Sequence, residues 1–102
     1  MAFKAAFIFI APENDYQVHQ AIVPAPFVEL HVVGVKTYDE GVAVAKKLVE
    51  QDGVGAIELC GGFGVEGVAQ IKQAVQGKAV VGVVRFDTHP GLDYKSGDDL
   101  FK

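Results

Sequence analysis

Apolar segments that look like β-strands alternate along this chain with segments of helical periodicity. The four strand-like segments, at residues 3–10, 27–35, 54–60 and 78–86, are nearly continuous apolar runs. Such runs are typical of strands in parallel sheets, whose connecting helices cover both faces. The pattern therefore predicts one α/β domain over the whole chain, with four strands, about three helices and three layers.

The helical segments differ in how clearly the sequence marks them. Residues 16–23 (YQVHQAIV) predict a short, weak helix that ends before two prolines. A stronger helix should begin at Thr37, which forms a capping-box pattern with Glu40, and end at Gly53. Residues 65–75 predict the third helix from their apolar spacing.

Right-handed crossovers leave two arrangements for four parallel strands. We expect a flavodoxin-like open sheet of order 2-1-3-4, with helices on both faces. The alternative is a curved 1-2-3-4 sheet that resembles half of a β/α barrel. Four strands cannot close a barrel alone, so this alternative would need a partner subunit.

Composition excludes several classes of protein and partner. The 102 residues include 13 acidic and 9 basic side chains, and the basic ones are scattered, which argues against a nucleic-acid surface. No apolar run approaches the roughly 20 residues of a membrane-spanning helix. The single cysteine, Cys60, cannot form an internal disulfide, so we expect a reducing, cytoplasmic setting. Two open sheet edges and an uncovered apolar patch predict a homo-oligomer.

Four blocks of the sequence resemble a known family. KAAFIFIAP, VELHVVGV, AIELCGGFG and VVGVVRFDTHPG, which together cover most of the chain, are similar to short bacterial proteins catalogued only as a domain of unknown function. The resemblance implies no activity and assigns no catalytic or binding residue.

Glycines after the third strand fit the spacing of a dinucleotide-binding loop. Gly62, Gly64 and Gly67 follow a strand and open a helix, and Asp87 comes about 20 residues later. Glu66 in the first helical turn would repel a pyrophosphate, and only one strand follows. We therefore expect a smaller anion, a phosphate or carboxylate, at the helix start, with nucleotide binding and a purely structural turn as alternatives.

Two charged residues lie within apolar strands. Glu58 shares a sheet face with Ala56 and Cys60, and Arg85 shares one with Val81. One hypothesis is a structural Glu58–Arg85 ion pair, because an unpaired buried charge is costly. The other is that Arg85 binds a substrate anion while Glu58 orients it or exchanges protons, and both can hold together.

Cys60 and the histidines are further candidates. Cys60 precedes the glycine turn, yet no histidine adjoins it, so we expect it to be a pocket wall and not a nucleophile. His89 follows the fourth strand at the carboxyl edge, where open α/β sheets bind ligands. His31 lies two residues after Glu29, which suggests a core or interface pair. A metal site of His31, Asp87 and His89 would lack a tight ligand motif.

Two classes of function follow from these residues. The first is a small-ligand-binding protein, with or without enzyme activity, that acts on a small anionic molecule at the carboxyl edge without a metal or cofactor. The second is a non-catalytic homo-oligomeric structural or regulatory module. In the first, His89 and Glu58 are the catalytic candidates, and the ligand-binding candidates are Arg85, Gly61, Gly62, Phe63, Gly64 and Asp87.

Overall fold

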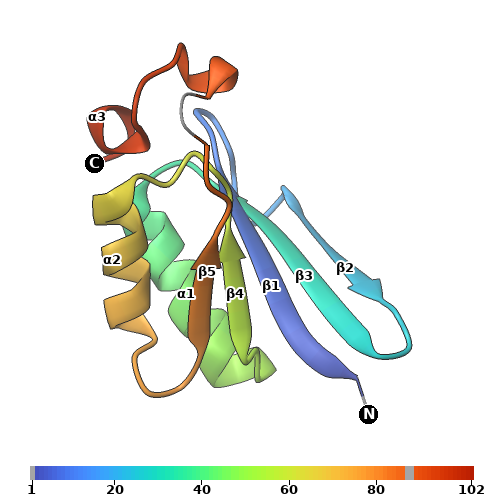
Figure 1. The fold of residues 1–102 in the computed structure, drawn as a ribbon. Coiled ribbons are helices and arrows are strands. Elements are labelled where there is room, and N and C mark those ends of the chain that lie inside the picture. The colour runs from blue at the N-terminus through green and yellow to red at the C-terminus, as the bar shows by residue number, and fades with distance from the viewer. Residues whose placement is uncertain (1, 87–88) are drawn as a thin grey trace.

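Five strands form one sheet in the order β2-β3-β1-β4-β5, parallel except for β2 at one edge (Figure 1). The computed structural model describes residues 2–86 and 89–102. The elements are β1 (Phe3–Ile10), β2 (Gln20–Pro24), β3 (Val28–Val35), α1 (Tyr38–Asp52), β4 (Ala56–Leu59), α2 (Val65–Ala74), β5 (Val80–Val83), the 3₁₀ helix η1 (Pro90–Leu92) and α3 (Gly97–Leu100).

Most of the predicted elements are confirmed. The four predicted strands correspond to β1, β3, β4 and β5, and their order in the sheet is the predicted 2-1-3-4. Helix α1 begins after Thr37, whose Oγ1 accepts a hydrogen bond from the Glu40 amide at 3.1 Å. It ends at Gly53, whose φ of 73° is the left-handed conformation that glycine adopts without strain.

The helix predicted over residues 16–23 is wrong, and the sheet has five strands instead of four. Residues 20–24 form β2, which pairs antiparallel with β3. The residues before it make tight turns, in which His19 Nδ1 accepts a hydrogen bond from the Asp15 amide at 2.8 Å. Ile22 and Val23 are β-branched, and such side chains favour a strand where a neighbouring edge is available for pairing.

This difference decides how the sheet is covered. Because the connection from β1 to β3 carries a strand instead of a helix, α1 and α2 come from the next two connections, β3 to β4 and β4 to β5. Both run in the same direction across the sheet, so right-handed crossovers place both helices on one face. The two helices pack against each other there (Figure 1). The helices thus form one layer, where the sequence predicted two.

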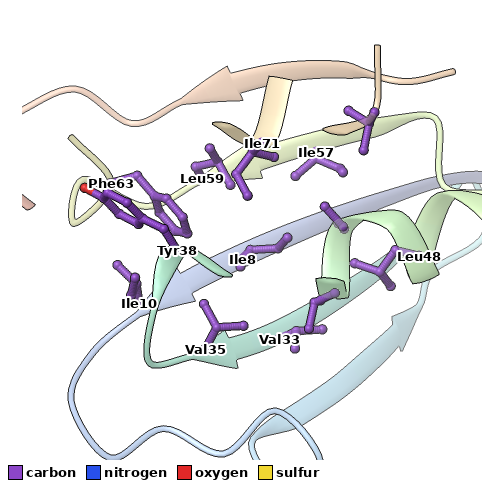
Figure 2. Close-up of a cluster of buried hydrophobic side chains, with 14 of the residues drawn as sticks. Ile8, Ile10, Val33, Val35, Tyr38, Leu48, Ile57, Leu59, Phe63 and Ile71 are labelled. Carbon is purple, nitrogen blue, oxygen red and sulfur yellow. The ribbon is translucent and has the colours of Figure 1, made fainter. Parts of the chain in front are cut away.

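The core lies between this helix layer and the sheet. Every second residue of β1, from Ala6 to Ile10, points into it, and so do the matching residues of β3 and β4 (Figure 2). The rings of Tyr38 and Phe63 stack at one end, with centroids 5.7 Å apart. Both aromatic side chains are buried. They link the start of α1 to the loop that precedes α2.

The other face of the sheet carries no helix in the described chain, and we call it the open face. Its residues alternate with the core residues along each strand, as strand geometry requires. Register places on it Glu58, two glycines and a set of apolar residues, which are Phe3, Ala5, Phe7, Phe9, Ala21, Val23, Val28, Leu30, Val32, Ala56 and Val80.

The C-terminal segment returns over the carboxyl ends of the strands and reaches the start of α2 (Figure 1). Phe101 is buried in the core, whereas Leu100 stays exposed. Phe101 therefore anchors the end of the chain in the core. None of the helices in the described part of the chain is long and apolar enough to cross a membrane.

Candidate functional site

A pocket of about 590 Å³ opens at the carboxyl ends of β4 and β5. One wall is the glycine loop, which we define as residues 61–64; its residues Gly61, Phe63 and Gly64 line the pocket, whereas Gly62 does not. The second wall is the segment after β5, including Arg85 and His89, and the third is the C-terminal segment, including Lys95. The structure therefore brings the glycine loop, Arg85 and His89 together, as the sequence led us to expect.

The charge of this pocket differs from that of the chain as a whole. The described residues that line it include Arg85 and Lys95 and no Asp or Glu. The chain carries 13 acidic and 9 basic residues, a net charge of -4. The two cations of the described lining, Arg85 and Lys95, favour the binding of an anion on an otherwise acidic protein.

Cys60 holds the glycine loop in place and does not line the pocket. Its sulfur accepts hydrogen bonds from the amides of Ile10 and Gly62, both at 3.3 Å. Its carbonyl accepts a third, from the Phe63 amide at 3.1 Å. The thiol is free. The expectation that Cys60 forms a pocket wall is thus replaced by a role in fixing the loop to β1.

The start of α2 is capped by a residue from the far end of the chain. Gly64 stands at the N-cap position and offers no side chain. The Asp98 carboxylate takes this role: it accepts hydrogen bonds from the Glu66 amide at 3.1 Å and the Gly67 amide at 3.3 Å. A carboxylate at a helix N-terminus also interacts favourably with the helix dipole. The predicted anion position is therefore filled by the chain's own carboxylate.

Tyr38 completes this cap. Its hydroxyl donates to Asp98 Oδ1 at 2.8 Å and accepts from the Gly64 amide at 3.0 Å. Burial is the main cause that raises the pKa of the Tyr38 hydroxyl above its ordinary value. Partial burial would also raise the pKa of Asp98, but hydrogen bonds from the Glu66 amide and Tyr38 outweigh it, so the pKa of this carboxyl is lowered. The carboxylate is the form that the site stabilises.

The glycines at G-x-G-x-x-G spacing permit this close packing. A Cβ at Gly64 would collide with the Asp98 carboxylate, and one at Gly67 would collide with the Tyr38 ring. A Cβ at Gly97 would collide with the carbonyl of Gly62. The spacing that resembles a nucleotide loop thus makes room for the tail and for Tyr38. The amides that a pyrophosphate would need are already hydrogen-bonded within the chain.

His89 has a structural contact as well as a place in the pocket wall. Its Nδ1 accepts a hydrogen bond from the Gly91 amide at 2.9 Å, which caps η1. Its ring packs against Phe86, with centroids 4.5 Å apart. Because Nδ1 is the acceptor, the neutral ring carries its proton on Nε2. His89 therefore offers the pocket an N–H donor.

Glu58 is not part of this site. It lies on the open face opposite Gly82, whereas Arg85 follows β5 beyond Val83. Glu58 does not line the pocket, and no Glu58–Arg85 ion pair forms among the described residues. The expected pair fails because the register offsets the two residues along neighbouring strands. The remaining candidate, Asp87, lies outside the described residues.

A second hollow, of about 480 Å³, lies between α1 and the β2–β3 edge. His31 lines it and is 7% exposed, and its Nε2 is 2.8 Å from Glu29 Oε2, so the predicted pair is confirmed. His31 and His89 line different hollows. Within residues 2–86 and 89–102 no cluster of three potential metal ligands is found.

Sequence reasoning missed Asp98, Tyr38 and Lys95. Asp98 lies in the first turn of its own short helix, α3. No neighbouring residue in the sequence indicates that its side chain contacts α2. The available signal was indirect: a helix that begins at Gly64 has no capping side chain of its own, so another residue must supply one.

Comparison with known proteins gives a family without an assigned function. No curated protein and no solved structure matches the chain. A family model described as "Family of unknown function (DUF6506)" matches residues 3–99. This range covers the sheet, α1, α2 and the Asp98 cap, so the match spans the architecture described above. The chain therefore belongs to the DUF6506 family of unknown function.

Proposed function

We propose that this protein binds a small anionic molecule in the pocket between the glycine loop, Arg85 and the C-terminal segment. The observation that carries the proposal is the charge of the lining: Arg85 and Lys95 are there, and no described acidic side chain is. The volume of about 590 Å³ lies within the range of small-molecule sites.

The walls favour a ligand with an apolar body and one anionic group. Phe63, Val68, Val83 and Phe86 give much of the lining an apolar character, and Arg85 and Lys95 supply its positive charges. An aromatic or aliphatic carboxylate, or a small organic phosphate, fits this combination. Arg85 would hold the anionic group through its planar, paired donors.

The anion would be held by side chains and not by the start of α2. The amides of Gly64, Glu66 and Gly67 donate to Tyr38 and Asp98. Arg85, Lys95 and the Nε2–H of His89 remain as donors in the pocket wall. For any turnover, His89 is the candidate for proton transfer in this wall. A reducing, cytoplasmic setting fits the free thiol of Cys60.

Thermal denaturation with a ligand panel tests this proposal. The panel contains phosphate, benzoate, hexanoate, phenyl phosphate, NAD and the neutral benzyl alcohol. We expect benzoate, hexanoate or phenyl phosphate to stabilise the protein, by about 2.7 kcal/mol at 100 times the dissociation constant. Arg85→Met should abolish this shift, and Lys46→Met, which changes an exposed charge on α1, should keep it. A shift with NAD alone, an equal shift with benzyl alcohol, or no shift with any anion would refute the proposal.

A further inference from the structure

The open face exposes large apolar side chains over its whole width. Phe3 on the central strand β1 is 54% exposed, Val23 on β2 is 52% exposed and Val80 on β5 is 70% exposed. Parallel sheets occur almost only with both faces covered. Here the helices of the described chain pack on one face, so the other face lacks its second layer.

The apolar residues of the open face are contiguous. The register aligns Val23, Leu30, Ala5, Ala56 and Val80 in one row that crosses all five strands. Such neighbours on one face of a sheet lie within contact distance of each other. The half-buried residues Leu30, Ala5 and Ala56 thus connect the exposed Val23 and Val80 into one apolar patch.

The size of this face is close to what a stable interface needs. The strands lie about 4.8 Å apart and range from about 13 Å for the four-residue β4 and β5 to about 26 Å for the eight-residue β1 and β3, which gives a flat footprint of about 450 Å². Because side chains project from the sheet, the accessible area of this face is larger than its flat footprint. It rises toward the roughly 800 Å² that each partner buries in a standard interface. Soluble monomers rarely expose an apolar patch of more than a few hundred Å².

The charge of the face narrows the choice of partner. Register places one ionisable residue on it, Glu58, and no Lys, Arg or His of the described strands. Nucleic acids and anionic membranes are bound through basic residues, so neither fits this surface. The partner must offer an apolar surface of similar size, and the open face of a second copy has that size and character.

We propose that two copies of this chain dimerise through their open faces. The two sheets pack face to face, about 10 Å apart, and each supplies the layer that the other lacks. A two-fold dimer uses the same patch on both copies, which agrees with a patch that is apolar except for Glu58. The dimer interface is on the sheet face opposite the helices, and the dimer forms without the ligand of the proposed pocket.

Sedimentation velocity and light scattering of the full chain, from 1 to 100 µM, test this proposal. We expect a species of twice the chain mass of 10.9 kDa. Val23→Lys and Val80→Lys each place a charge at an end of the apolar row and should raise the dissociation constant at least tenfold. Val18→Lys is the matched control. Val18 is an exposed valine, at 68%, but it lies before β2 and is therefore not part of the open face.

A fourth variant moves the equilibrium in the opposite direction. Glu58→Leu removes the charge from the open face and should strengthen the dimer. Circular dichroism checks that all variants keep the wild-type fold. A wild-type monomer at 100 µM, a dimer that persists in both Val23→Lys and Val80→Lys, or equal dissociation by Val18→Lys would overturn the proposal.

Discussion

The hydroxyl of Tyr38, the first residue of α1, donates a 2.8 Å hydrogen bond to Asp98, in the last short helix of the chain. The same carboxylate caps α2. The Asp98 carboxylate thus joins the starts of α1 and α2 to the C-terminal segment. Because that segment forms a wall of the proposed pocket, the cap also holds the pocket together.

The first prediction concerns the loss of this cap. Asp98→Ala leaves the Tyr38 hydroxyl and the Glu66 and Gly67 amides without their acceptor, so the free energy of unfolding should fall by about 1–3 kcal/mol. Urea denaturation measures it. Asp99→Ala removes the neighbouring exposed carboxylate and should change stability by less than about 0.5 kcal/mol. Equal effects of the two variants would show that Asp98 is not a cap.

The second prediction is a pH dependence. The pKa of Asp98 is lowered in the folded state from its ordinary value of 3.8, so its charged form stabilises the fold above that value. This contribution should disappear as the pH falls through the folded pKa. The stability difference between wild type and Asp98→Asn should therefore be constant above about pH 5 and shrink toward pH 2. A difference that grows on acidification would contradict the assignment.

The third prediction uses a double-mutant cycle at the glycine loop. Gly64→Ala should destabilise the protein, because the new Cβ collides with the Asp98 carboxylate. In the Asp98→Ala background the same substitution should cost less, since the obstacle is gone. Coupling of about 0.5–3 kcal/mol is typical of residues in contact. Strict additivity of the two substitutions would mean that the glycine is required for another reason.

The fourth prediction separates two properties of Cys60. Cys60→Ser keeps an acceptor for the Ile10 and Gly62 amides and should be nearly silent in stability and ligand binding. Cys60→Ala removes the acceptor and should cost about 1–2 kcal/mol. Chemical denaturation of the two variants side by side compares them. A Cys60→Ser variant that folds normally but loses turnover would instead support a nucleophilic thiol.

The fifth prediction divides binding from turnover in the proposed pocket. His89→Ala should leave binding of the anionic ligand in place, because Arg85 supplies the main charge, and should remove any turnover. Isothermal titration of the variant with the ligand found in the panel measures the first effect, and product assays measure the second. If His89→Ala loses ligand binding while Arg85→Met keeps it, then His89 and not Arg85 binds the anionic group, and the prediction is wrong.

Local patterns in the sequence predicted much of the fold. The apolar runs predicted β1, β3, β4 and β5, and the Thr37 and Gly53 signals placed both ends of α1. Right-handed crossovers then favoured the observed order of these strands. The position of Arg85, His89 and the glycine loop at one edge follows from the same rules, because parallel strands end at the same edge.

What the sequence by itself determined is therefore the set of elements that short-range patterns specify: the apolar runs, the caps of α1 and the edge where the strands end. Only the tertiary structure decided that residues 20–24 pair with the free edge of β3, since a short segment without a strong local preference adopts the structure its neighbours stabilise. That pairing left one sheet face open. Contacts distant in sequence also decided the roles of Asp98 and Glu58, because a cap or an ion pair depends on distances that only packing and register set.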